Sequence, residues 1–430
     1  MQYPMLLTNE PRIVVVGLGY VGLPLAVALA NHFDVTGLDV DSSRIAELRN
    51  GHDRTNEIAP DRLLRSPLRL TDLGEDARGA DLYIVTVPTP VDHANRPDLA
   101  PLLAATEAIA KLIDAARPAT IVYESTVYPG VTEDICGPAI ERASGLTRGT
   151  HFFLGYSPER INPGDKEHRI DSIVKVVAGE NEAVTDQLAH VYGHVTTAGT
   201  FRARSIMTAE AAKVIENAQR DINIAFVNEV TRIFSRIGLS VWDVLETAGT
   251  KWNFLNFQPG LVGGHCIGVD PYYLSHLAQE LGHEPRVVLA GREINDSMGG
   301  WVAEELHARR GGRAGSALIL GITFKENVPD MRNSRVIDIV NGLRAKGHEV
   351  SIHDPLADPA ETQREYGVVL DRAALAGRYD LVVCAVAHDE YRQLDDKAVE
   401  GLLCENGLLA DLKGVWRGRT LSGVRNHWSL

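Results

Sequence analysis

The stretch RIVVVGLGYVGLPLA, residues 12–26, decides how the first part of the chain folds. Its first half, RIVVVGLG, is a continuous apolar run that ends in glycines, which is typical of a strand buried on both faces of a parallel sheet. Small and apolar residues at helical spacing follow in YVGLPLAVALANH. Strand, glycine turn and helix together predict the opening of a doubly wound α/β domain.

The three glycines of this turn, Gly17, Gly19 and Gly22, have the G-x-G-x-x-G spacing of a dinucleotide site. This spacing allows a tight turn, close approach of a pyrophosphate and close packing of helix on sheet. The N-terminus of the helix then offers free N–H groups and a positive dipole end to the phosphates. The alternative is that the glycines serve packing alone.

Asp39 ends the second predicted strand, DVTGLDV, 22 residues after Gly17. An acidic residue at this place would bind a ribose 2′-hydroxyl and would repel the 2′-phosphate of NADP. We therefore expect NAD as the cofactor, although the nearby Arg44 leaves some tolerance of NADP.

Two further predicted strands, in ADLYIVTVP and ATIVYEST, end at the same edge of the sheet, where ligands bind in such folds. Ordinary turns between strand and loop would explain the residues there equally well without their neighbours. The expected rim of the cofactor site consists of Tyr20, Val21, Thr86, Pro88 and Thr126.

Residues 208–235, TAEAAKVIENAQRDINIAFVNEVTRIFS, contain neither glycine nor proline and predict a long amphipathic helix. It can connect two domains and offer a dimerisation face, so we expect a homodimer; an ordinary bundle helix is the alternative. Its apolar positions at helical spacing are Ala212, Ile215, Ile222, Phe226, Val230 and Phe234.

Strand patterns resume after Gly315 in SALILGIT, HEVSIHDP, YDLVVCAVAH and GLLADLK, a weaker echo of the first domain. The predicted fold is α/β, with two Rossmann-like doubly wound domains joined by a long central helix and a helical middle domain. The expected boundaries are 1–205, 206–305 and 306–430. Ligands are expected in the cleft between the two Rossmann-like domains.

Length and composition limit the class of protein. A chain of 430 residues exceeds one hydrophobic core, and no apolar run approaches the 18 or so residues of a membrane span. The N-terminus lacks the charged region and cleavage site of a signal peptide, so a cytoplasmic location is expected. The net charge of −14 disfavours nucleic-acid binding.

The stretch LVGGHCIGVDPYYL, residues 261–274, allows three interpretations of Cys266: a buried filler, a metal ligand with His265, or a nucleophile. Adjacent side chains diverge and no HxxxH or CxxC partner is evident, so no metal site is expected. Cys384 and Cys404 lie in apolar runs that predict packing, as does Cys136. Cys266 alone has a glycine-rich, polar context, and without CxxC spacing no disulfide framework is expected.

Six motifs are spread over nearly the whole chain: GLGYVGLPLA, STVYPG, SPERINPGDKEHR, AAKVIENAQRDINIAFVNE, GGHCIGVDP and TFKENVPDMRNSR. In these motifs and in their order the chain resembles the UDP-glucose/GDP-mannose dehydrogenase family. The resemblance implies oxidation of the C6 alcohol of a nucleotide sugar to a carboxylate with two NAD, the first domain binding NAD and the last the UDP-sugar.

Within the family, the chain is most similar to bacterial UDP-N-acetylglucosamine 6-dehydrogenases of surface polysaccharide synthesis. UDP-glucose enzymes usually have Cys-x-Pro-Lys-Asp where this chain has Cys266-Ile-Gly-Val-Asp270. This departure argues against UDP-glucose as the main substrate. The epimers UDP-N-acetylmannosamine and UDP-N-acetylgalactosamine remain alternatives.

The resemblance also implies catalytic roles. Cys266 would hold the aldehyde as a thiohemiacetal and then as a thioester. Lys213 and Asn217 lie one turn apart on a helix face; Lys213 would stabilise an oxyanion and Asn217 would hold the substrate or the oxyanion, unless that face is merely solvated. Asp270 would handle a water or proton, and Glu159 would be the general base of thioester hydrolysis.

Further roles follow by the same resemblance. Thr126 would bind the catalytic water. For Glu159, the alternative to the role of general base is an ion pair with Arg160. Lys325 would bind the UDP and Arg335 the NAD pyrophosphate, because guanidinium and ammonium groups suit phosphates; otherwise both are surface charges. The expected substrate contacts are Glu159, Arg160, Lys213, Asn217, Phe257, Gly260, Gly263 and Lys325.

Two other classes of function fit the same fold. One is a non-catalytic sensor of a nucleotide sugar or NAD, since fold alone does not define function. The other is a two-electron dehydrogenase that stops at an aldehyde or ketone. The role of His265 stays open.

Overall fold

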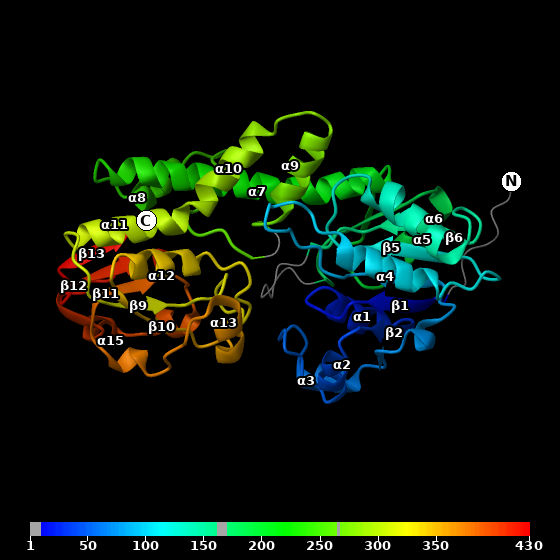
Figure 1. Cartoon of the computed structure of the whole chain (residues 1–430), viewed down its shortest axis with the longest axis horizontal. Coiled ribbons are helices and arrows are strands. Elements are labelled where there is room, and N and C mark those ends of the chain that lie inside the picture. The colour runs from blue at the N-terminus through cyan, green and yellow to red at the C-terminus, as the bar shows by residue number, and fades with distance from the viewer. Residues whose placement is uncertain (1–9, 161–169, 265–266) are drawn as a thin grey trace. The chain divides into compact units, whose positions relative to one another are not determined.

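The computed structural model describes residues 10–160, 170–264 and 267–430 (Figure 1). It divides into two compact units, each built around its own sheet. The first unit is Met1–Glu216 with Tyr272–Gly282, and the second is Asn217–Pro271 with His283–Leu430.

The described strands of the first sheet run in the order β3-β2-β1-β4-β5-β6-β7-β8. Neighbours pair in parallel, except that β6 and β7 are antiparallel. The order 3-2-1-4-5-6 is that of a Rossmann fold and confirms the predicted doubly wound domain. The strands are β1 (Arg12–Val16), β2 (Asp34–Leu38), β3 (Arg69–Thr71), β4 (Leu82–Val85), β5 (Ala119–Tyr123), β6 (Phe152–Tyr156), β7 (Lys175–Gly179) and β8 (Thr200–Arg202).

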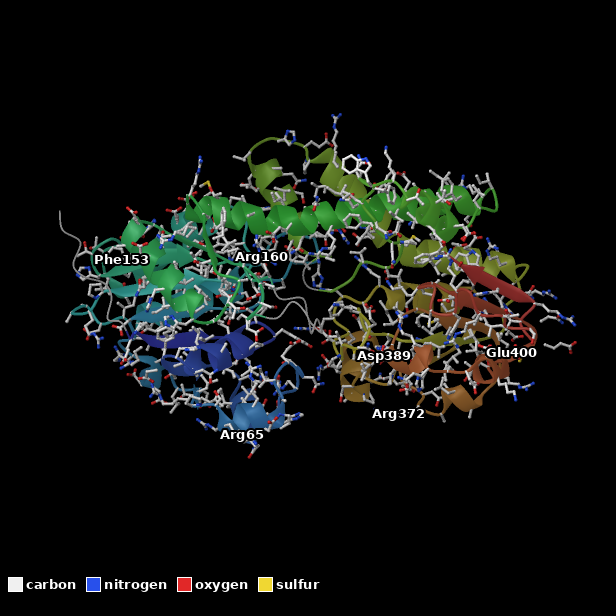
Figure 2. The ribbon with its side chains drawn as sticks, turned by 180° about the vertical axis from the view of Figure 1, so that it is seen from behind. Arg65, Phe153, Arg160, Arg372, Asp389 and Glu400 are labelled. Carbon is white, nitrogen blue, oxygen red and sulfur yellow. The ribbon has the colours of Figure 1, made fainter. Side chains whose placement is uncertain are left out.

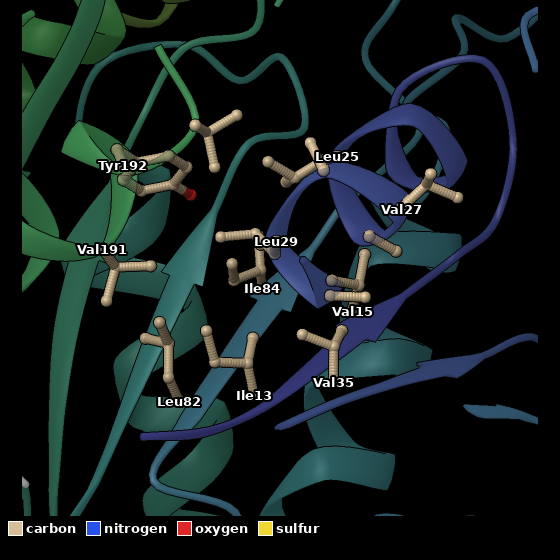
Figure 3. Close-up of a cluster of buried hydrophobic side chains, with 14 of the residues drawn as sticks. Ile13, Val15, Leu25, Val27, Leu29, Val35, Leu82, Ile84, Val191 and Tyr192 are labelled. Atoms are coloured by element: carbon tan, nitrogen blue, oxygen red, sulfur yellow. The ribbon is translucent and has the colours of Figure 1, made fainter. Parts of the chain in front are cut away.

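Strand β1 is buried on both faces, as its continuous apolar run predicts. Ile13 and Val15 join one hydrophobic cluster with α1 (Gly22–Ala30) and α6 (Glu182–Gly193) (Figure 3). Val14 and Val16 join another with α4 (Ala100–Ala110) and α5 (Gly137–Ser144). Each fully buried valine or isoleucine contributes roughly 1.5–3 kcal/mol. The helices of this unit are α1 (Gly22–Ala30), α2 (Ser42–Arg49), α3 (Pro60–Arg65), α4 (Ala100–Ala110), α5 (Gly137–Ser144) and α6 (Glu182–Gly193).

The second sheet has the order β10-β9-β11-β12-β13, and its described strands are parallel. In chain order this is 2-1-3-4-5, so the strand order reverses between β9 and β11, where ligands bind in such folds. Its elements are β9 (Ser316–Leu320), α12 (Val336–Ala345), β10 (Glu349–His353), α13 (Pro359–Tyr366), β11 (Tyr379–Cys384), α14 (Asp389–Arg392), α15 (Asp396–Gly401), β12 (Leu403–Asp411) and β13 (Asn426–Ser429).

The turn after β9 in the second sheet has the same geometry as the glycine turn after β1, as the similar sequence pattern predicts. Gly17 and Gly321 have φ of +92° and +89°, and each N–H donates across to the end of the neighbouring strand at 2.8 Å. Asp39 and Asp354 follow those neighbouring strands. Asp354, however, is buried and accepts four backbone N–H groups, so it is committed to the fold.

The middle of the chain is helical. The predicted helix over 208–235 is observed as α7 (Ile206–Ser235), whose residues up to Glu216 belong to the first unit. The others are α8 (Val241–Ala248), α9 (Asp270–Glu280), α10 (Arg286–Asp296) and α11 (Met298–Arg309). No helix among the described residues is long and apolar enough to cross a membrane.

Candidate active site

The glycine turn between β1 and α1 has room for a ligand on one side only. A Cβ on Gly22 would lie 1.9 Å from the carbonyl oxygen of Gly17 and 2.3 Å from Thr86 Oγ1, so no other residue fits there. A Cβ on Gly19 would meet nothing within 4 Å, and Gly19 is exposed. The open side of the turn at the N-terminus of α1 therefore suits a pyrophosphate.

Asp39 lies directly after β2, half-buried, beside this turn. Its Oδ2 accepts the Leu18 N–H at 2.7 Å and its Oδ1 accepts the Asp41 N–H at 2.9 Å. A carboxylate has about four acceptor positions, so each oxygen retains one for a ribose hydroxyl. The turn and the carboxylate together fit NAD.

Arg44 is buried and holds the glycine turn by a hydrogen bond to its backbone. Its Nε donates to the carbonyl oxygen of Leu18 at 3.0 Å, and its Nη2 donates to Asp53 Oδ1 at 2.7 Å. Burial opposes ionisation of Asp53, but hydrogen bonds from Thr55 and Arg44 lower its pKa. Whether Arg44 also contacts the cofactor remains a prediction.

The other residues of the predicted rim lie around the carboxyl ends of β1, β4 and β5. Thr86 Oγ1 donates to the carbonyl oxygens of Gly17 at 2.7 Å and Val16 at 3.0 Å, so its hydroxyl holds the turn together. Pro88 is exposed, whereas Tyr20, Val21 and Thr126 are half-buried.

Glu159 follows β6 and belongs to a buried cluster that sequence reasoning missed. Lys175 Nζ lies 2.7 Å from Glu124 Oε2 and 3.1 Å from Glu159 Oε2, and the Tyr192 hydroxyl donates to Glu124 Oε1. Burial raises the pKa of Glu124 to about 7 against the opposing effect of Lys175. Burial lowers the pKa of Lys175, but the carboxylates of Glu124 and Glu159 outweigh it and raise that pKa.

One sequence signal could have found this cluster. Lys175 stands inside the apolar run SIVKVVAG, and a lysine in a buried strand requires an acidic partner. The choice of partner depends on the pairing of distant strands, which no local pattern gives.

Arg160 does not form the predicted alternative pair with the carboxylate of Glu159. Its backbone N–H donates to Glu159 Oε1 at 2.5 Å, while its guanidinium pairs with Glu216. Figure 2 labels Arg160 in the segment after β6, the strand that carries the buried Phe153. The guanidinium is thus held by Glu216, and the Arg160 side chain is only partly exposed.

Asn217 and Asp270, both predicted from motifs, are brought together in the second unit. Asn217 Nδ2 donates to Asp270 Oδ2, and both residues are buried. Lys213 lies one turn earlier on α7, within the first unit, and is 7% exposed. The alternative of a solvated helix face is therefore wrong for these residues.

The loop before Cys266 is fixed by a reciprocal amide pair. Asn228 Nδ2 donates to the carbonyl oxygen of Gly260, and the Gly260 N–H donates to Asn228 Oδ1, both at 2.9 Å. A Cβ on Gly263 would lie 2.5 Å from the carbonyl oxygen of Asn333, so this close approach needs glycine. Cys266 and His265 lie outside the described residues.

Phe257, predicted to lie near the sugar, packs against a small hydrophobic cluster of the second unit. That cluster consists of Val227, Val241, Trp242 and Leu245. Part of the ring therefore serves packing, and its contact with a substrate remains a prediction.

The carboxyl edge of the second sheet forms a pocket at the reversal of strand order. Lys325 and Arg335, both predicted, line it together with Lys413, which sequence reasoning missed. Arg335 is held by ion pairs with Asp296 and Asp338. Lys413 follows β12 in ADLKG. A lysine just beyond the carboxyl end of a strand in a nucleotide-binding fold is the sequence signal that could have predicted it as part of this pocket.

The remaining cysteines differ in burial. Cys136 and Cys384 are fully buried, as the packing prediction requires, whereas Cys404 is only half-buried. Among the residues that the structure describes, no group of three histidine, cysteine or acidic side chains could hold a metal ion.

Family models match the chain in three consecutive parts. Residues 11–196 match the NAD binding domain of the UDP-glucose/GDP-mannose dehydrogenase family, 207–297 its central domain and 318–418 its UDP binding domain. The chain therefore belongs to the UDP-glucose/GDP-mannose dehydrogenase family. It is an NAD-dependent oxidoreductase of nucleotide sugars, and the predicted cofactor, NAD, is confirmed.

Similar proteins align over nearly their whole length. Protein CapL of Staphylococcus aureus is 49% identical, with 97% of this chain and 99% of that protein covered. The UDP-N-acetyl-D-glucosamine 6-dehydrogenase of Pseudomonas aeruginosa is 47% identical, with coverages of 94% and 97%. The solved UDP-D-ManNAc dehydrogenase from Pyrococcus horikoshii is 27% identical with a TM-score of 0.85, covering 97% of this chain and 98% of that one.

Proposed function

We propose that the protein oxidises the C6 alcohol of UDP-N-acetylglucosamine to a carboxylate in two successive two-electron steps. The relatives named for this activity, from Salmonella typhi and Pseudomonas aeruginosa, are 46% and 47% identical to the chain. A relative named as a UDP-N-acetyl-D-mannosamine dehydrogenase, from Methanocaldococcus jannaschii, is 32% identical. The difference favours the glucosamine epimer.

In the proposed mechanism Cys266 is the nucleophile. Its sulfur adds to the C6 aldehyde to give a thiohemiacetal, oxidation gives a thioester, and water releases the carboxylate. NAD, when bound, accepts the hydride of each oxidation; Gly17, Gly19, Gly22 and Asp39 would hold it. A thiol that keeps the aldehyde attached explains how one site completes both oxidations.

The observation that supports this proposal most is the buried hydrogen bond between Asn217 and Asp270. Asp270 follows Cys266 by four residues, and the amide fixes the orientation of the aspartate. We assign Asp270 to a proton or water near the thiol, and Lys213 and Asn217 to the oxyanion at C6. Such an oxyanion contact contributes about 3–4 kcal/mol in comparable enzymes.

We assign the remaining residues as follows. Glu159 is the general base of hydrolysis and Thr126 binds the water. Lys325 and Lys413 bind the diphosphate at the pocket of the second sheet, where cations meet the carboxyl ends of strands. Arg335 stays assigned to a pyrophosphate, and the loop with Gly260 and Gly263 to the sugar.

The test is NADH release measured against a panel of UDP-sugars. UDP-N-acetylglucosamine should give two NADH per sugar, and replacement of Cys266 by Ala should abolish carboxylate formation while UDP-sugar binding stays measurable. One NADH per sugar would indicate a two-electron dehydrogenase, and no NADH with any sugar would indicate a sensor. Activity with UDP-glucose alone would refute the N-acetyl assignment.

We also propose a homodimer formed through α7. The helix exposes Ile215, Phe226 and Ile233, which are 55%, 61% and 54% exposed. Ile215 and Ile222 are seven residues apart, as are Phe226 and Ile233, and four residues separate the two pairs; this spacing is typical of a helix that packs on another helix. Light scattering would report a mass of one chain if this is wrong.

The domain boundaries 1–205, 206–305 and 306–430 and the cytoplasmic location remain part of the proposal.

A further inference from the structure

Four side chains around the end of β6 form a buried polar cluster, the Lys175 cluster. It consists of Lys175 on β7, Glu124 after β5, Glu159 after β6 and Tyr192 on α6. The side chains of Lys175, Glu124 and Glu159 are 2%, 0% and 7% exposed. The Lys175 ammonium also lies 5.3 Å from the centre of the Tyr192 ring.

The charges of this cluster are unequal. Among the described residues, one ammonium faces two carboxylates where water is excluded, and buried charges of this kind are tolerated only when paired and hydrogen-bonded. Glu124 uses Oε2 for Lys175 and Oε1 for the Tyr192 hydroxyl. Glu159 uses Oε2 for Lys175 and Oε1 for the Arg160 N–H. These two donors to Glu159, Lys175 and the Arg160 N–H, come from different segments of the chain.

We infer that Lys175 is a positioning residue for Glu159, held in place by Glu124 and Tyr192, and that it keeps Glu159 unprotonated for the hydrolysis step. This inference rests on the proposed function. In that step an O–H bond of water breaks, its proton goes to Glu159, and its oxygen bonds to the thioester carbon. The C–S bond breaks with its electron pair on the Cys266 sulfur, and the new carboxylic acid ionises.

Two substitutions should act differently. Lys175→Met removes the ammonium that faces Glu159, so Glu159 binds a proton more tightly and the base is lost at higher pH. Burial raises the pKa of Glu124 to about 7, so Glu124 is already protonated below that pH. Glu124→Gln, which keeps an oxygen for Lys175, should therefore leave the proton affinity of Glu159 nearly unchanged. A purely structural role of the cluster predicts no such difference, because both substitutions would simply weaken the fold.

The experiment is the pH dependence of kcat with saturating UDP-N-acetylglucosamine and NAD. We expect the acidic limb to move up by about one pH unit or more in Lys175→Met and to stay near the wild type in Glu124→Gln and Lys175→Arg. kcat of Lys175→Met should fall about 10-fold or more while KM changes little. Glu159→Gln should remove the limb.

The controls separate the possible failures. Glu159→Gln is isosteric and keeps the test valid if Lys175→Met does not fold. A wild type that releases no NADH refutes the proposed function and the inference with it. If the wild type is active, a limb that stays fixed in Lys175→Met, or that moves up equally in Glu124→Gln, refutes the inference alone, as does a limb that survives in Glu159→Gln.

Discussion

Replacing Asn228 with Ala should loosen the loop that precedes the proposed nucleophile. Asn228 is fully buried and makes three hydrogen bonds, to the N–H and carbonyl oxygen of Gly260 and to Asn295 Oδ1, the last at 2.8 Å. A buried group left without its partner costs about 1–3 kcal/mol. Partial access of water and the better helix propensity of alanine reduce the summed cost of the three lost hydrogen bonds to about 3–5 kcal/mol of unfolding free energy.

The assay follows thermal unfolding and turnover of the same variant. For a unit of about 150–250 residues, each kcal/mol of lost stability lowers Tm by about 2–4 °C, so the Tm of the second unit should fall by at least about 6 °C. kcat/KM should fall about 10-fold or more, because a displaced loop misplaces the thiol that follows it.

Asn223 provides a matched control on the same helix. Within the described part of the chain its Nδ2 donates to one acceptor, the carbonyl oxygen of Gln219 one turn earlier on α7. Asn223→Ala should therefore stay within about 0.5 kcal/mol of the wild type. If Asn228→Ala melts and turns over like Asn223→Ala, the assignment of Asn228 as the anchor of this loop is wrong.

Three further predictions concern cofactor and catalysis. Gly22→Ala should lower both Tm and NAD affinity, because its Cβ would lie 1.9 Å from the carbonyl oxygen of Gly17. Gly19→Ala should weaken NAD binding, measured by calorimetry, without lowering Tm, because its Cβ would meet nothing within 4 Å. An equal loss of Tm in both variants would contradict this prediction. Asp39→Asn should reduce the preference for NAD over NADP about 10-fold, measured as the ratio of kcat/KM values, and an unchanged ratio would exclude the ribose contact. Asp270→Asn should lower kcat about 10²-fold or more with UDP-sugar binding retained, so near-normal turnover would remove it from the mechanism.

The sequence predicted the parts of the fold that local patterns determine. Strand β1 was expected from its apolar run, α7 from its spacing, and the turn with Gly22 from the motif, since each signal lies within a few consecutive residues. Strands β6, β7 and β8 were not predicted, although FFLGY of β6 is an apolar run. The antiparallel pairing of β6 with β7 depends on residues far apart in the chain.

The site divides in the same way. Motif resemblance named Asn217 and Asp270, but their hydrogen bond could not be read from a separation of 53 residues. Lys175 and Glu124 were missed because their pairing spans 51 residues. Long-range contacts of this kind become visible only when the sheet order is known.

The most direct test of the account is mass spectrometry of the Cys266 peptide after rapid acid quench of enzyme turning over UDP-N-acetylglucosamine with NAD. We expect a covalent thioester to the oxidised sugar nucleotide on Cys266, and more of it in Glu159→Gln, where hydrolysis is slowed. An unmodified Cys266 in both proteins during active turnover would contradict a covalent, four-electron mechanism.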